Sequence, residues 1–169
     1  MEPKIIDSPA ITLVGFSFYG DPLRLSAGWT EENEVGRLWS RFMPFFQANQ
    51  EHIQHLNEDA AYEAHIEHPE TAETGQYEVF LGVAVEQVEN LPLELLIKVL
   101  PPTKYAVFTI SGALLPEEWA LEVYGEWLPQ SGYEAKPYMF WRYDERYKGL
   151  DHLADSELEV YVPLESPHE

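Results

Sequence analysis

Two stretches, Ile11-Thr-Leu-Val-Gly-Phe-Ser-Phe-Tyr-Gly20 and Tyr105-Ala-Val-Phe-Thr-Ile-Ser-Gly112, decide the fold. Each is rich in β-branched and aromatic residues, ends in glycine and precedes a segment with helical periodicity, so each is predicted to be a strand. Two further strand-like segments follow each helical segment, at residues 61–67 and 77–88 and at residues 138–143 and 158–162. The order strand, helix, strand, strand therefore occurs twice along the chain.

The first helical segment is predicted to begin after Thr30, because threonine is a good N-cap and the glutamates that follow favour a helix N-terminus. Apolar residues from Val35 to Leu56 then recur at intervals of three and four, so one stripe of this helix faces a core. Pro44 lies inside the stripe. It is expected to kink or divide the helix, since proline lacks a backbone N–H and clashes with the preceding turn.

The second helical segment has Pro116 near its first position and is expected to be closed by Pro129 and Gly132. Its inner face carries two rows of residues four apart: Trp119, Val123 and Trp127, and Ala120, Tyr124 and Leu128. A connecting strand is expected at residues 95–100. We therefore predict an α+β fold in which duplicated β-α-β-β halves form an antiparallel sheet, with two covering helices and a central ligand groove between the halves.

The length and composition indicate one domain over residues 1–169. Cysteine is absent, which excludes disulfides, thiolate nucleophiles and cysteine-ligated metals. The start lacks the basic and apolar regions of a signal peptide, and no stretch is apolar enough to span a bilayer. These features predict a soluble cytoplasmic protein that does not contact membranes.

The charge balance disfavours nucleic acid and suits cations. The chain has 30 acidic and 10 basic residues, a formal net charge of −20, which repels phosphate backbones and argues against direct nucleic-acid binding. Four basic residues gather at positions 136–148, but Asp144 and Glu145 lie among them and favour a salt-bridged surface. The 5 Trp, 10 Tyr and 8 Phe supply ring faces that attract the same cations as the carboxylates do.

Alternation along the last strand places Leu158, Val160 and Val162 on one face and Glu159 and Tyr161 on the other. Glu159 is then either exposed to solvent or a counter-ion for a cation inside an aromatic cavity. The densest aromatic run, at residues 138–143, places large rings on both of its faces. Core packing explains these rings as well as a binding wall does.

Four segments together carry a family resemblance: Glu2-Pro-Lys-Ile-Ile-Asp-Ser-Pro-Ala-Ile-Thr-Leu-Val-Gly15, the strand from Tyr105 to Gly112, Tyr124-Gly-Glu-Trp-Leu-Pro129 with Ser131-Gly-Tyr133, and Glu159-Val-Tyr-Val-Pro163. In this order and spacing, the chain resembles the GyrI-like effector-binding domain over almost its whole length. The resemblance implies a duplicated fold whose central groove binds small molecules, often lipophilic cationic drugs, through aromatic residues and glutamate. Members occur alone or fused to DNA-binding helices in multidrug-sensing regulators, and this chain resembles the stand-alone members.

The resemblance and the aromatic pattern together define the candidate site. Its ligand-binding residues are Trp39, Tyr105, Phe108, Trp127, Trp141, Tyr143, Glu159 and Tyr161. The sequence departs from the family where many relatives carry Phe-Glu-x-Tyr, because it has Trp141 in place of that glutamate. An indole keeps a cation–π surface but removes a negative charge, so cation binding is expected to depend on Glu159 and to weaken in Glu159→Gln.

Two other functions fit the same resemblance. Some stand-alone members hydrolyse cyclopropane-bearing natural products, in which case Glu159, Tyr161 and Glu126 are the candidate catalytic residues. The acidic surface also fits an inhibitor that binds DNA gyrase as a protein partner. Product formation with excess substrate, and gyrase supercoiling with and without the protein, distinguish these functions from ligand binding.

Metal binding is the weakest alternative. Four imidazoles, on His52, His55, His65 and His68, could in principle converge on zinc. Their polar surroundings favour surface histidines instead. We expect no metal and no cofactor, and the expected partner is a lipophilic cationic small molecule.

Overall fold

A computed structural model describes residues 1–22, 32–115 and 118–166. Its strands are β1 (Lys4–Ser8), β2 (Ile11–Gly20), β3 (Leu56–Ile66), β4 (Tyr77–Val85), β5 (Leu96–Leu100), β6 (Thr103–Ser111), β7 (Glu134–Ala135), β8 (Tyr138–Tyr143) and β9 (Glu157–Glu165). Its α-helices are α1 (Glu34–Ala48), α2 (Thr71–Thr74), α3 (Glu118–Ala120) and α4 (Leu128–Ser131). A π-helical segment, Leu121–Trp127, joins α3 to α4, and short 3-10 turns lie at Gln50–His52, Gly112–Leu114 and Leu150–Asp155. None of the described helices is long and apolar enough to cross a bilayer.

The strands form one antiparallel sheet in the order β1-β6-β9-β8-β3-β4-β2-β5, with the short β7 paired to β9. One half contributes β2, β3 and β4, and the other contributes β6, β8 and β9. Their strands appear in mirrored order, β6-β9-β8 and β3-β4-β2, and the halves meet where β3 pairs with β8. The strand that leads each half pairs with the other half, β1 with β6 and β5 with β2. The predicted α+β architecture with duplicated β-α-β-β halves is confirmed, and the exchanged leading strands tie the two halves together.

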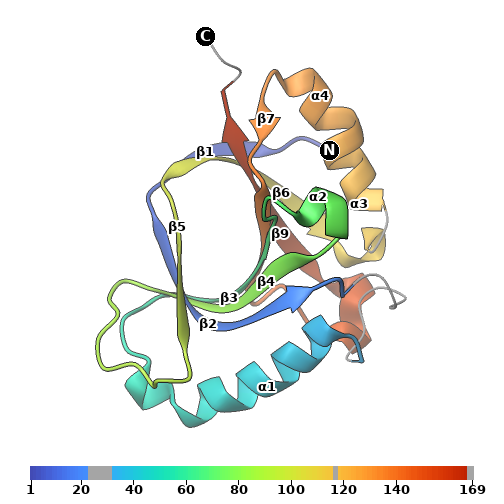
Figure 1. The fold of residues 1–169 in the computed structure, drawn as a ribbon. Helices are drawn as coiled ribbons and strands as arrows, with labels where there is room; N and C mark the ends of the chain where they lie inside the picture. The colour runs from blue at the N-terminus through green and yellow to red at the C-terminus, as the bar shows by residue number, and fades with distance from the viewer. Residues whose placement is uncertain (23–31, 116–117, 167–169) are drawn as a thin grey trace.

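A pair of glycines lets the sheet curl. Gly15 and Gly82 lie opposite each other on β2 and β4. A Cβ atom on Gly15 would lie 1.8 Å from the carbonyl oxygen of Leu81, and a Cβ atom on Gly82 would lie 2.0 Å from that of Val14. Only glycine fits where two backbones approach this closely, so the strands can bend across this point. The result is the strongly curled sheet of Figure 1, with β1 and β5 at its two ends.

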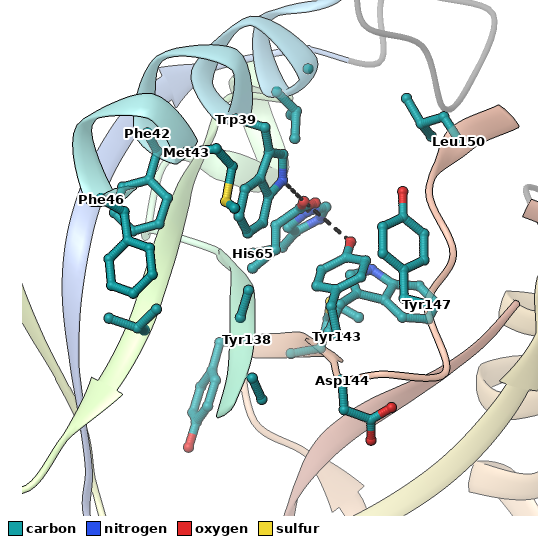
Figure 2. A pocket seen from close by; sticks show the side chains of 18 of the residues that line it. Trp39, Phe42, Met43, Phe46, His65, Tyr138, Tyr143, Asp144, Tyr147 and Leu150 are labelled. Atoms are coloured by element: carbon teal, nitrogen blue, oxygen red, sulfur yellow. Dashed lines mark hydrogen bonds and ion pairs between the residues drawn. The ribbon is translucent and has the colours of Figure 1, made fainter. Parts of the chain in front are cut away.

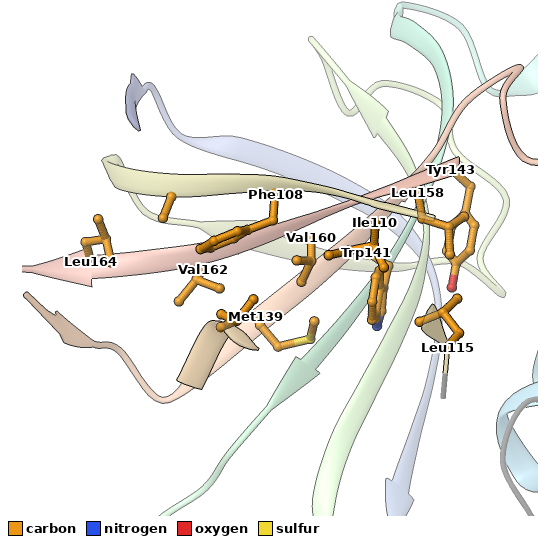
Figure 3. Packing of buried hydrophobic residues seen from close by; sticks show 12 residues of the cluster. Phe108, Ile110, Leu115, Met139, Trp141, Tyr143, Leu158, Val160, Val162 and Leu164 are labelled. Atoms are coloured by element: carbon orange, nitrogen blue, oxygen red, sulfur yellow. The ribbon is translucent and has the colours of Figure 1, made fainter. Parts of the chain in front are cut away.

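Side-chain alternation gives the sheet two different faces. The helix face packs under α1 and under the α3–α4 segment. Phe42 of α1 packs on Leu81 and Val83 of β4. Val123 of the α3–α4 segment packs on Val160 of β9. Figure 3 shows the second of these clusters, with its side chains projecting from β6, β8 and β9. The opposite face holds a separate cluster: Leu13, Ala60, Tyr62, Ala64, Phe80, Ala84, Leu100, Tyr105, Val107 and Phe140.

Helix α1 differs from its prediction in extent and continuity. It begins at Glu34, where the side-chain oxygen of Asn33 accepts a hydrogen bond from the backbone N–H of Gly36 at 2.8 Å; the predicted cap lies outside the described residues. Of the two outcomes predicted for Pro44, a kink or a division of the helix, the division does not occur. The helix runs through Pro44, and Phe42, two residues before it, is buried in the cluster beneath α1. It ends at Ala48, so Leu56 belongs to β3 instead.

The second helix is continuous from α3 to α4, and its predicted end is half right. Gly132 ends it in the left-handed conformation, with φ of 75°, as expected. Pro129 does not close it, because the π-helical segment ends at Trp127 and the proline then falls in the first turn of α4, where no backbone donor is needed. Pro116 lies outside the described residues.

Candidate functional site

A large cleft of about 1540 Å³ opens on the helix face, over the seam where β3 pairs with β8. Ligand pockets usually measure roughly 300 to 1000 Å³, so this cleft has room for a bulky molecule. Its walls carry ten aromatic side chains: Trp39, Phe42, Phe46, Tyr77, Trp119, Tyr124, Tyr138, Trp141, Tyr143 and Tyr147. They also carry six carboxylates and one ammonium group: Glu58, Asp59, Glu63, Glu67, Asp144, Glu145 and Lys136. The described lining therefore favours an aromatic ligand with positive charge.

The carboxylate of Glu63 lies at the centre of the seam and is only 5% exposed. It accepts a hydrogen bond from Trp39 Nε1 at 2.6 Å, one from His65 Nε2 at 2.7 Å and a longer one from the Tyr143 hydroxyl at 3.3 Å. Figure 2 shows these three side chains converging from α1, β3 and β8. A buried carboxylate normally carries a high free-energy cost, and these donors offset part of it.

Strand register explains why this carboxylate meets so many rings. Glu63 lies directly opposite Trp141 across the β3–β8 pair, so both side chains project on the helix face. Trp119 packs edge-on against Trp141 with ring centroids 4.7 Å apart, and Trp39 packs edge-on against Tyr143 at 5.7 Å. Rings from both halves of the molecule therefore surround one buried negative charge.

Burial keeps the phenols of the cleft protonated. It raises the pKa of Tyr143 well above its usual value, and the nearby charge of Glu63 raises it further, so the hydroxyl remains a donor to Glu63. Burial likewise raises the pKa of Tyr77 and of Tyr124 to about 12. The Tyr77 oxygen is buried without a hydrogen-bond partner among the described residues.

Three of the eight predicted ligand residues, Trp39, Trp141 and Tyr143, line the cleft. Phe108 and Trp127 instead pack against each other in the core beneath the α3–α4 segment, with ring centroids 5.2 Å apart. Neither lines the cleft, because Trp127 projects from the π-helical segment onto Phe108 of β6 beneath it.

The other three predicted residues lie on the opposite face. Tyr105 and Tyr161 belong to the aromatic cluster there, with centroids 5.8 Å apart. Glu159 lies on the same face, as alternation predicted, but the cleft lies on the Val160 face. Its carboxylate is 3.1 Å from Arg142 Nη1 and 3.0 Å from Arg146 Nη2. The ligand role of Glu159 stays a prediction, although two guanidinium groups already neutralise it.

The same guanidinium groups confirm the predicted salt-bridged character of this basic segment. Asp144 lies 2.8 Å from Arg142 Nη1 and 2.6 Å from Arg146 Nη2. Hydrogen bonds from Arg146 hold the pKa of the Asp144 carboxyl well below its ordinary value of 3.8, although burial opposes them. The network joins β8, β9 and the chain that follows β8, directly beside the cleft.

This depressed pKa predicts an acid-dependent contribution to stability. A carboxylate with a lower pKa in the folded state stabilises the fold above its unfolded pKa, and the contribution disappears as the pH falls below about 3.8. We expect Asp144→Asn to lower the unfolding temperature at pH 7 and to converge progressively on the wild type as the pH falls below about 3.8. Asp151→Asn, at an exposed carboxylate, is the control and should show no such convergence. A pH-independent difference for Asp144→Asn would contradict the assignment.

The sequence analysis missed Glu63 and His65 as site residues. The strand signal at residues 61–67 contained the clue, because alternation puts both side chains on the face opposite to Tyr62 and Ala64. The four histidines do not converge: His65 contacts Glu63 and His68 contacts Glu78, at 3.0 Å in the second case. His52 and His55 line a separate pocket of about 80 Å³. No group of three or more metal-ligating side chains occurs within the described ranges.

The catalytic candidate Glu126 also lies outside the cleft lining. It is exposed on the π-helical segment, between Gly125 and the half-buried Trp127. The chain therefore places Glu126 at the surface, and Glu63 is the only glutamate of the described lining that is buried.

Comparison with known proteins gives consistent results. The sequence model of the GyrI-like small molecule binding domain matches residues 1–165. The transcriptional regulator BrlR of Pseudomonas aeruginosa is 27% identical over 168 residues, which cover 97% of this chain and 56% of the regulator. The chain thus spans little more than half the length of that protein.

Two solved structures share the fold at low sequence identity. The structure of SAV2435 bound to tetraphenylphosphonium matches with a TM-score of 0.69 and 17% identity, covering 98% of this chain and 94% of SAV2435. EcmrR in its complex with DNA matches with a TM-score of 0.66 and 14% identity, covering 98% of this chain and 58% of EcmrR. At these identities the likeness shows a common fold.

Proposed function

This chain belongs to the GyrI-like family of small-molecule-binding domains, and from that premise we propose that its cleft binds bulky lipophilic cations with Glu63 as counter-ion. One observation carries the proposal. A nearly fully buried carboxylate lies at the centre of a large cleft whose walls carry ten aromatic side chains. A cation placed there gains both the charge of Glu63 and the ring faces around it.

The hydrogen bonds of Glu63 leave it able to act as a counter-ion. Trp39, His65 and Tyr143 donate to it, and the indole and phenol donors carry no positive charge to neutralise it. An ionised carboxylate offers about four acceptor positions, so the donors stabilise the charged form without saturating it. A cation in the cleft would add a full positive charge beside a carboxylate whose protein partners are an indole, a phenol and the imidazole of His65.

The neighbouring Trp141 supports the same assignment. Relatives with Phe-Glu-x-Tyr carry a carboxylate at the position of Trp141, whereas here Glu63 stands directly opposite that position on the paired strand. We propose that the charge has moved across the seam from β8 to β3. The cleft would then keep a central carboxylate and gain an additional indole wall.

The available interactions suffice for useful affinity. A micromolar complex needs roughly 8 kcal/mol of binding free energy. Each cation–π contact contributes about 0.5 to 2 kcal/mol, and burial of apolar ligand surface contributes about 25 cal/mol per Å² before the entropic cost of association is subtracted. Several rings, Glu63 and the burial of apolar ligand surface together therefore meet the requirement.

Tetraphenylphosphonium is a suitable probe, because SAV2435 binds it on the same fold. We expect it to bind this chain once per molecule with a micromolar Kd. Trp39, Trp119 and Trp141 line the cleft, so titration should quench tryptophan fluorescence, and calorimetry should give the same Kd. The neutral triphenylphosphine oxide should bind at least tenfold more weakly. Equal affinities for the two compounds would reject a cation site.

A further inference from the structure

The cleft has a second polar region that cation binding at Glu63 does not use. Lys136 and the phenols of Tyr77 and Tyr124 also line the cleft, and we call these three residues the donor end. Strand pairing brings two of them to one level of the sheet. Tyr77 begins β4, and its neighbour Glu78 pairs with Ile66 of β3. Ile66 in turn pairs with Tyr138 of β8, and Lys136 precedes Tyr138 by two residues.

Tyr77 presents a hydroxyl that the described protein does not satisfy. Its oxygen is buried and has no hydrogen-bond partner among the described residues, although buried polar groups are nearly always paired. The phenol stays protonated at neutral pH, since burial raises its pKa to about 12. A group that enters the cleft and accepts this hydrogen bond would remove the cost of leaving the hydroxyl unpaired.

Lys136 is the only Lys or Arg side chain in the described lining. It is partly buried, and no carboxylate of the described residues lies within ion-pair distance of its ammonium group. Six carboxylates share the same walls, and one of them, Glu67, lies near enough to Tyr124 for its charge to raise the pKa of that phenol, so Lys136 is the one positive side chain of the described lining, set among acidic neighbours. Glu63 accepts at the centre, and Tyr77 and Lys136 donate at one end.

We infer that the ligands of this cleft are bipolar, with a lipophilic cation at Glu63 and a carboxylate or other hydrogen-bond acceptor at the donor end. The inference rests on the proposed function and narrows its ligand class. Lys136 lies five residues from Trp141, the residue opposite Glu63, so at a rise of about 3.3 Å per residue its backbone is up to roughly 16 Å from that position. Tyr77 lies nearer the centre, because its ring packs against that of His65, a donor to Glu63, with centroids 5.4 Å apart. The lysine side chain shortens the span that a ligand must bridge.

A matched pair of compounds tests the inference. Alkyltriphenylphosphonium and ω-carboxyalkyltriphenylphosphonium salts share the same cation, and chains of four to ten carbons vary the reach of the carboxylate. We expect one intermediate chain length at which the carboxylate compound binds about fivefold more tightly than its alkyl counterpart. The acidic cleft and the acidic chain repel a ligand carboxylate, so tighter binding of the carboxylate compound could only come from donors near the ligand carboxylate.

Two variants assign the preference to residues. Lys136→Met and Tyr77→Phe should each abolish or reverse it, measured as the ratio of the Kd values of the alkyl and the carboxylate compound in the same variant. Lys148→Met, at an exposed lysine outside the lining, should keep the full preference. Tyr77→Phe should also fold at least as stably as the wild type, because it removes an unpaired buried hydroxyl.

The outcomes separate this inference from the proposed function. If the alkyl compounds bind and the carboxylate brings no advantage at any length, the inference is overturned and the cation site stands. An advantage that survives in both Lys136→Met and Tyr77→Phe also overturns it. If no phosphonium compound binds the wild type, the proposed function is rejected and the inference with it.

Discussion

Glu63→Gln is expected to weaken the binding of tetraphenylphosphonium about a hundredfold. Glutamine keeps the shape of the side chain and can still accept from Trp39 Nε1, so the variant removes mainly the charge. Two unit charges about 5 Å apart at an effective dielectric constant near 20 interact with roughly 3 kcal/mol, which corresponds to about a hundredfold in Kd. Fluorescence quenching and calorimetry measure the change.

Two controls make this result specific. Binding of triphenylphosphine oxide should change less than threefold in Glu63→Gln, because a neutral ligand does not use the charge. Glu159→Gln compares the two hypotheses for the counter-ion, and we expect it to leave phosphonium affinity within twofold of wild type, since Arg142 and Arg146 already pair with Glu159. A large loss in Glu159→Gln with a small loss in Glu63→Gln would overturn the assignment made from the cleft.

Phe140→Ala is expected to cause the largest loss of stability, about 3 to 5 kcal/mol in the free energy of unfolding. Phe140 is fully buried on the opposite face, stacks on Tyr161 with centroids 4.5 Å apart, and contacts the rings of Tyr105 at 5.4 Å and Tyr62 at 5.6 Å. Removing it leaves a cavity between β3, β6, β8 and β9 that rigid strands cannot fill. Chemical denaturation monitored by circular dichroism gives the value.

The same variant separates stability from binding. Phe140 does not line the cleft, so the folded fraction of Phe140→Ala should bind tetraphenylphosphonium with a Kd within twofold of wild type. Phe45→Ala, at a partly exposed ring on α1, should cost less than half as much stability. A loss below 1 kcal/mol for Phe140→Ala would show that the cluster on the opposite face is not a tightly packed core.

Much of the fold follows from local sequence patterns. The runs that end at Gly20 and Gly112 are strands followed by helical segments, and residues 138–143 form β8 over the predicted range. Gly132 ends the second helix as its conformational freedom allows. These predictions succeeded because periodicity and turn residues act over a few neighbouring positions, where packing seldom overrides them. Hydrolysis of a ligand and inhibition of gyrase stay predictions.

Packing overrode local rules at the two helices. Proline is a strong local signal against a helix, yet α1 continues through Pro44 because its buried stripe, including Phe42, extends along the sheet. The π-helical segment Leu121–Trp127 shifts Pro129 into a first turn, where it is tolerated. Neither outcome could be predicted locally, since each depends on contacts with strands far away in the sequence.

Local alternation is enough to assign residues to the two faces of each strand: Glu159 shares a face with Tyr161, and Glu63 shares one with His65, apart from Tyr62. Which face the helices cover, and therefore which glutamate lines the cleft, depends on long-range packing. Alternation looks the same whichever side of a strand is covered, whereas the position of a helix depends on how its apolar stripe packs across the curled sheet. Strand pairing then placed Glu63 opposite Trp141 and left Glu159 with two arginines on the other side.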